Sequence, residues 1–97
     1  MSVAETRPTG TVFAAEKAWR LSPHVALRDE SFGALAYHYG TRRLVFLKSR
    51  LLVDLVSSLG EYHSAAEAIA ALVPEQQRTG YERALTRLAS SEVIDAC

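Results

Sequence analysis

The chain has almost no cysteine, no net charge and no long apolar segment. Its 97 residues include one cysteine, Cys97, which excludes an intramolecular disulfide and a cysteine-ligated zinc cluster. Lysine plus arginine and aspartate plus glutamate number 11 each, and this balance argues against a dedicated binder of the nucleic-acid backbone. There is no basic segment followed by an apolar run at the N-terminus, and no run long enough to cross a bilayer. We therefore expect a cytoplasmic protein without a nucleic-acid or membrane partner.

The composition is that of one ordinary globular domain. Hydrophobic residues make up 48% of the chain and charged residues 23%, which is typical of a folded protein of this class. Residues 1–17 carry Pro8 and Gly10 among small and polar side chains, without sustained periodicity. This pattern predicts a flexible N-terminal tail over 1–17 and a domain over 18–97.

Three short strands are predicted before the first helix. Apolar and other residues alternate over 24–28 and again over 34–39, with turn-forming residues over 29–33 between them. After a hairpin turn at 40–41, residues 44–47 form an uninterrupted apolar run. Because this run is apolar on both faces, we expect helices to cover one face and other parts of the chain to cover part of the second.

Three helices follow the strands. Ser49 is a suitable N-cap for a leucine-rich helix that ends at Gly60. A capping box at 64–67 begins an alanine-rich helix that ends at Pro74, and a third helix is predicted over 75–90. The order β-β-β-α-α-α, with a short extended piece at 93–94, predicts an α+β, winged-helix-like fold. Its three-stranded antiparallel sheet is N-terminal and its three helices follow.

No group of residues has the spacing of a catalytic or metal site. His24, His38 and His63 are not spaced to place two imidazoles on one helical face, and no cysteine accompanies them. Ser49 and Ser64 are explained by helix capping, and the nucleophile, phosphate-loop and dinucleotide motifs are missing. We expect a protein that is not an enzyme and that binds neither a metal nor a cofactor.

The third strand offers a binding edge. Since only helices follow it, its outer edge has no strand to pair with, and another chain can add there. Four basic residues and no acidic one lie over 42–50, and Arg83 and Arg87 share a stripe of the third helix. If that helix packs beside the strand, the groove between them suits an extended peptide that carries acidic residues. Two alternatives stay open: the arginines are ordinary solubilising charges, or the strand has no free edge.

The ordered features of residues 19–60 resemble a known family. The LSP, the turn and strand LRDESFGALAY, the strand RLVFL and the leucine-rich helix resemble the PqqD-like peptide chaperones, the RiPP recognition elements. The resemblance extends through the third helix and is strongest to the branch that serves mycofactocin biosynthesis. It implies a non-enzymatic chaperone that binds the leader of a short precursor peptide and presents it to a radical S-adenosylmethionine maturase.

The resemblance also implies where the peptide binds. In the family, the leader adds as a strand to the third strand and packs against the third helix. Carried over to this chain, the implied peptide-binding residues are Arg43, Leu44, Val45, Phe46, Leu47, Tyr81, Arg83, Ala84, Arg87 and Leu88. The competing hypotheses are a winged-helix DNA-binding transcription regulator, since the architecture is related, and a module that uses the same strand to associate with itself.

Overall fold

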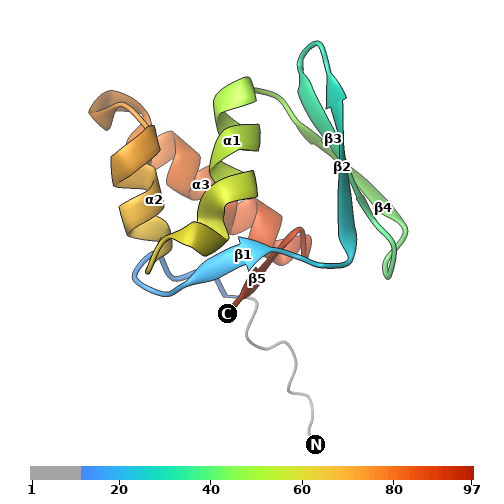
Figure 1. The fold of residues 1–97 in the computed structure, drawn as a ribbon, viewed down its shortest axis with the longest axis horizontal. Coiled ribbons are helices and arrows are strands. Elements are labelled where there is room, and N and C mark those ends of the chain that lie inside the picture. Colours follow the sequence, from blue (N-terminus) through green and yellow to red (C-terminus); the bar gives the residue numbers. More distant parts are fainter. Residues whose placement is uncertain (1–11) are drawn as a thin grey trace, which may run out of the picture.

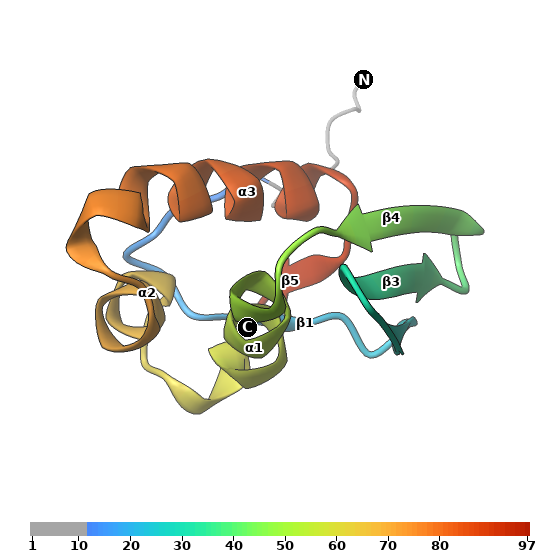
Figure 2. The same ribbon diagram turned by 90° about the horizontal axis from the view of Figure 1, so that it is seen from above.

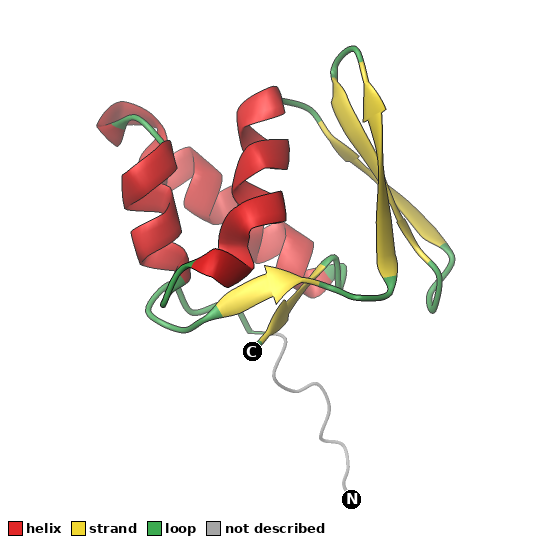
Figure 3. Ribbon diagram, in the orientation of Figure 1, coloured by secondary structure: helices red, strands yellow, loops and turns green. Residues whose placement is uncertain are grey.

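The computed structural model describes residues 12–97 and has an α+β fold of two antiparallel sheets and three helices (Figures 1 and 3). The predicted fold class is confirmed. The elements in chain order are β1 (Trp19–Leu21), β2 (Val25–Glu30), β3 (Gly33–His38), β4 (Arg43–Leu47), α1 (Arg50–Ser58), α2 (Ala65–Leu72), α3 (Arg78–Ser90) and β5 (Ile94–Ala96).

The larger sheet contains the three predicted strands in the order β2-β3-β4. Its register pairs Val25 with His38 across β2 and β3, and Ala36 with Val45 across β3 and β4. Strand β2 continues to Glu30, so the first turn is shorter than the predicted 29–33 segment. The last predicted strand, β4, is an edge strand of this sheet.

A second, two-stranded sheet joins the ends of the described chain. Strand β1 pairs with β5, with Trp19 opposite Ala96 and Leu21 opposite Ile94. The sequence predicted an extended piece near β5 but did not predict β1, because three residues are too few to show an alternating pattern. Trp19 of β1 belongs to the core and is 2% exposed.

Residues just before β1 contact the domain. The Trp19 indole donates to the carbonyl oxygen of Ala14 at 2.9 Å, and its ring centroid lies 5.1 Å from that of Phe13. The amides that begin α2 donate to the carbonyl oxygens of Ala15 and Lys17. Most of the predicted tail, residues 1–11, lies outside the described residues, and 13–17 are joined to β1 and α2 by these contacts.

The three predicted helices are present, with shifted ends. The hydroxyl of Ser49 accepts from the amide of Leu52 at 2.9 Å, and that of Ser64 accepts from Glu67 at 3.1 Å, so both predicted N-caps are confirmed. A 3-10 turn over Leu59–Glu61 follows α1, and another over Glu75–Gln77 precedes α3. Among residues 12–97, no helix is long and apolar enough to cross a membrane.

The core lies between the helices and one face of the larger sheet. Figures 1 and 2 both place α1 between α2 and this sheet. Ala34 and Ala36 on the inner face of β3 are fully buried, and their small side chains allow α1 to pack closely against the strand. The largest fully buried side chains are those of Trp19, Leu47, Leu55, Leu59, Leu85 and Ile94.

Candidate peptide-binding site

The backbone groups at the open edge of β4 come from Leu44 and Phe46. The amide of Tyr39, just after β3, donates to the carbonyl oxygen of His24, just before β2, at 2.8 Å. The backbone N–H and C=O groups of the odd-numbered residues of β3 therefore point toward β2. Backbone groups of an antiparallel strand alternate between its two edges, so the even-numbered residues of β3 bond to β4. Their partners on β4 are Leu47, Val45 and Arg43. The N–H and C=O groups of the intervening residues therefore point away from the sheet.

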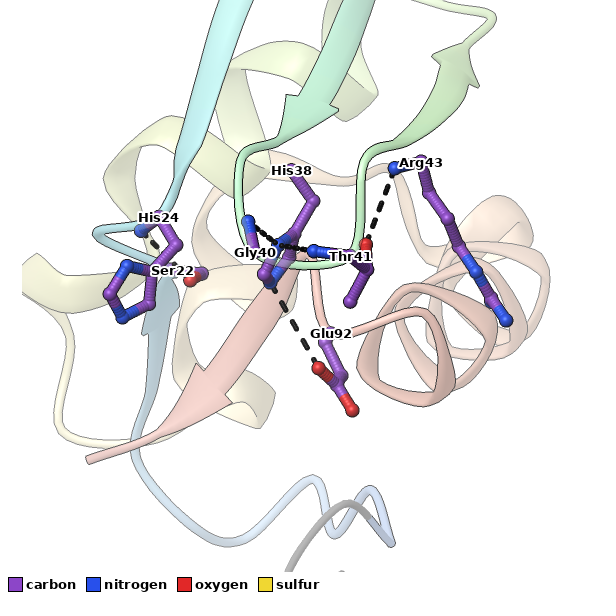
Figure 4. A network of polar contacts seen from close by, with 7 residues as sticks. All are labelled: Ser22, His24, His38, Gly40, Thr41, Arg43 and Glu92. Carbon is purple, nitrogen blue, oxygen red and sulfur yellow. Dashed lines mark hydrogen bonds and ion pairs between the residues drawn. The ribbon is translucent and has the colours of Figure 1, made fainter.

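The turn that starts β4 is held by His38. The amides of Gly40 and Thr41 donate to Nδ1 of this ring at 3.0 and 3.1 Å, so the ring proton of the neutral imidazole is on Nε2 (Figure 4). That atom lies 4.0 Å from a carboxylate oxygen of Glu92. Arg42 adopts a positive φ of 64° and donates through its amide to the carbonyl oxygen of His38 at 2.7 Å. These contacts set the position at which β4 begins.

The other end of β4 is held against the β2–β3 turn. Gly33 has a φ of 148°, and a Cβ atom there would overlap the carbonyl oxygen of Leu47. Only glycine permits this close approach of two backbones. Arg50 donates to the carbonyl oxygen of Gly33 at 3.2 Å and pairs with Asp29 at 3.5 Å, which ties the start of α1 to the same turn.

A cavity of about 400 Å³ lies where the end of β4 meets α1 and α3. A hydrogen bond joins two of its lining residues: the hydroxyls of Ser49 and Tyr81 are 3.0 Å apart, although the residues are 32 positions apart in sequence. Figure 2 shows β4 on the α3 side of the sheet. An extended chain along the open edge of β4 would therefore pass the mouth of this cavity. The lining residues are Lys48, Ser49, Leu52, Gln76, Gln77, Gly80, Tyr81 and Ala84.

Two of the residues implied on the third helix, Tyr81 and Ala84, line the cavity. Leu88 does not present its side chain there, because it is 5% exposed and belongs to the core. Arg83 and Arg87 are exposed. Arg83 lies three residues after Gly80, and Arg87 three residues after Ala84, so both arginines lie on the stripe of α3 next to the one that lines the cavity. They flank the cavity rather than line it.

The implied residues of β4 divide between its two faces. Leu47 is fully buried and Val45 half-buried, with Arg43 on the same face. The inner face of this strand is covered, and the outer face is covered only in part, by the ring of Phe32 against Phe46. Leu44 is 60% exposed and Phe46 57% exposed, because the sheet is the outermost layer here and all the helices lie on its other side.

Six of the eight lining residues were not predicted as part of a binding site: Lys48, Ser49, Leu52, Gln76, Gln77 and Gly80. In the sequence, Lys48 is one of the four basic residues over 42–50, and Leu52 belongs to the leucine-rich helix. Their role depends on α1 and α3 meeting at this point, and no local pattern signals that contact.

The histidines do not form a metal site. His38 is buried and its Nδ1 is occupied by two amides, whereas His24 is exposed, with ring centroids 6.1 Å apart. Within residues 12–97, no three His, Cys, Asp or Glu side chains gather closely enough to hold a metal ion.

Comparison with known proteins identifies the family. Residues 18–95 match the sequence model of the peptide chaperone MftB family. The chain belongs to this family. A peptide chaperone MftB from Mycolicibacterium smegmatis is 45% identical over 83 residues, which cover 84% of this chain and 81% of the relative. A second MftB, from Mycobacterium tuberculosis, is 40% identical over 89 residues, covering 91% and 82%. No solved structure gives a significant match.

Membership in the MftB family confirms two predictions. The resemblance to the PqqD-like peptide chaperones, strongest to the mycofactocin branch, is confirmed by the family match and by both relatives. A peptide chaperone has a non-catalytic role, so the prediction that the protein is not an enzyme is confirmed as well.

Proposed function

We propose that this MftB-family chaperone binds the leader of the mycofactocin precursor peptide by strand addition to β4 and presents it to a radical S-adenosylmethionine maturase. The observation that carries the proposal is the open edge of β4. Leu44 and Phe46 direct backbone groups outward there that pair with no other strand of residues 12–97, beside a cavity whose walls include Leu52, Tyr81 and Ala84.

Strand addition supplies both affinity and register. The main-chain groups at the edge bind any extended peptide, and side chains at alternate positions then select its sequence. Side chains that point toward α3 reach the cavity. Lys48 lines the cavity, Arg43 begins β4, and Arg83 and Arg87 are exposed on α3. These positive charges favour a leader with acidic residues. In the proposed site, Leu47 and Leu88 act from the core by shaping the groove.

Presentation to the maturase follows from binding only the leader. The rest of the peptide stays free but is tethered to the chaperone. If the maturase docks on the same chaperone, a short flexible tether raises the effective concentration of the free segment at the enzyme to about the millimolar range. The chaperone then needs no chemistry of its own.

The structure gives little support to the DNA-binding alternative. In winged-helix regulators a helix enters the major groove with basic or amide side chains. Helix α2 has the sequence AAEAIAAL and contains neither kind. Helix α3 carries the exposed Arg83 and Arg87, but the whole chain has a net charge of zero.

Calorimetric titration tests the proposal. The full chain is titrated with the mycofactocin precursor and, separately, with the same peptide lacking its leader. We expect one-to-one binding that requires the leader. Equal binding of both peptides, or none by folded protein, would contradict the proposal. Salt-sensitive binding to duplex DNA would instead favour the regulator, and concentration-dependent dimers in sedimentation the self-associating module.

A further inference from the structure

We propose that the bound peptide contacts β4 on both faces of the sheet, so that its recognised segment carries apolar side chains at consecutive positions. This inference rests on the proposed function. The contact surface beyond the cavity is an outer apolar patch, which we define as Phe32, Leu44 and Phe46.

The outer apolar patch lies on the face turned away from the helices. Its three side chains are 43%, 60% and 57% exposed, and the rings of Phe32 and Phe46 pack against each other with centroids 5.8 Å apart. Leu44 and Phe46 are two residues apart on the edge strand, so both side chains stand directly beside the place where a new strand would lie.

The backbone geometry places the peptide against this patch. Leu44 and Phe46 supply the main-chain groups at the open edge, and their own side chains point to the outer face. A strand that bonds to these groups lies about 4.8 Å from β4, with directly opposed Cβ atoms roughly 5 Å apart. Every second peptide side chain must then contact Leu44 or Phe46. The remaining side chains point to the other face, toward Val45 and the cavity.

Two apolar surfaces on opposite faces of one edge require a particular ligand. A peptide that was apolar only at alternate positions would cover the cavity and leave the patch in water, or the reverse. Burying both surfaces needs about four consecutive apolar residues, because side chains alternate between faces. The ligand class is therefore an extended peptide with an uninterrupted apolar stretch, rather than one with an apolar and polar alternation.

The first arm of the test changes the protein. Phe46→Thr and Leu44→Thr remove apolar area but keep the backbone N–H and a residue that favours strands. The matched control is Tyr39→Thr, since Tyr39 is 61% exposed on the same face while its amide bonds to His24, the residue before β2, on the side away from the open edge. In titrations with the mycofactocin precursor, we expect Kd to rise about tenfold for Phe46→Thr and less than twofold for the control.

The second arm changes the peptide. Single serine substitutions along the leader should reveal a run of consecutive sensitive positions. Sensitivity at every second position only, or an unchanged Kd for both Phe46→Thr and Leu44→Thr, would overturn this inference alone. A wild-type dimer that Phe46→Thr dissociates without changing peptide affinity would also overturn it, by assigning the patch to a second copy. Failure of the unchanged protein to bind the precursor would overturn the proposed function as well.

Discussion

Proline substitutions in β4 distinguish its two edges. Val45 directs its N–H toward β3, whereas Phe46 directs its N–H to the open edge. Proline has no N–H and is tolerated in a sheet only where no ladder bond is needed. Val45→Pro should therefore damage the fold, and Phe46→Pro should damage peptide binding. Two adjacent positions are expected to give opposite phenotypes.

The magnitudes follow from the groups that lose their partners. Val45→Pro removes one ladder hydrogen bond and leaves the carbonyl of Ala36, a fully buried residue of β3, unpaired, which costs about 2–4 kcal/mol. That is a large share of the roughly 5–15 kcal/mol by which a typical domain is stable. Phe46→Pro leaves the ladder intact, so its free energy of unfolding should fall by less than about 1 kcal/mol.

Affinity measurements on two variants of Phe46 separate the contribution of its backbone N–H from that of its side chain. Phe46→Thr lacks the ring but keeps the N–H, so it is the reference for Phe46→Pro. Losing one main-chain bond and placing a pyrrolidine ring at the edge should weaken precursor binding by a further factor of about ten. Urea unfolding and calorimetric titration measure the two effects. Equal affinities of the Pro and Thr variants would refute strand addition at this edge, and undiminished stability of Val45→Pro would refute the assigned direction of the amides.

Other substitutions test how the site is built. Gly33→Ala should lower the free energy of unfolding in urea by about 2–4 kcal/mol, because it combines a positive φ with a backbone overlap; Gly80→Ala, with nothing within 4 Å of the new methyl group, should raise it by about 0.5–1 kcal/mol. Ser49→Ala should lower the free energy of unfolding by about 1–2 kcal/mol, because it removes the N-cap of α1. A double-mutant cycle of Ser49→Ala with Tyr81→Phe should show a coupling energy of about 0.5–1.5 kcal/mol, and additive effects would mean that the two hydroxyls do not interact. Arg87→Glu should weaken precursor binding more at low salt than at 0.5 M salt, and equal weakening at both would indicate that the arginine acts through packing.

Local chemistry was enough to predict most elements. Serine hydroxyls at the starts of α1 and α2 satisfy amides within three residues, so the capping positions can be recognised from short segments alone. The alternation over β3 depends only on neighbours in the chain, and it correctly located the middle strand. The position of β4 at the sheet edge followed from its being the last strand before the helices.

Long-range packing settled what the local patterns left open. The pairing of β1 with β5 joins segments more than 70 residues apart, and neither is long enough to reveal itself. Both faces of β4 are equally apolar in sequence, so only the placement of the helices determines that Val45 and Leu47 face the core while Leu44 and Phe46 stay exposed. The cavity likewise exists only because α1 and α3 meet at Ser49 and Tyr81. Capping and alternation are interactions between near neighbours, whereas the faces, edges and hollows that bind a partner are created by contacts between distant segments.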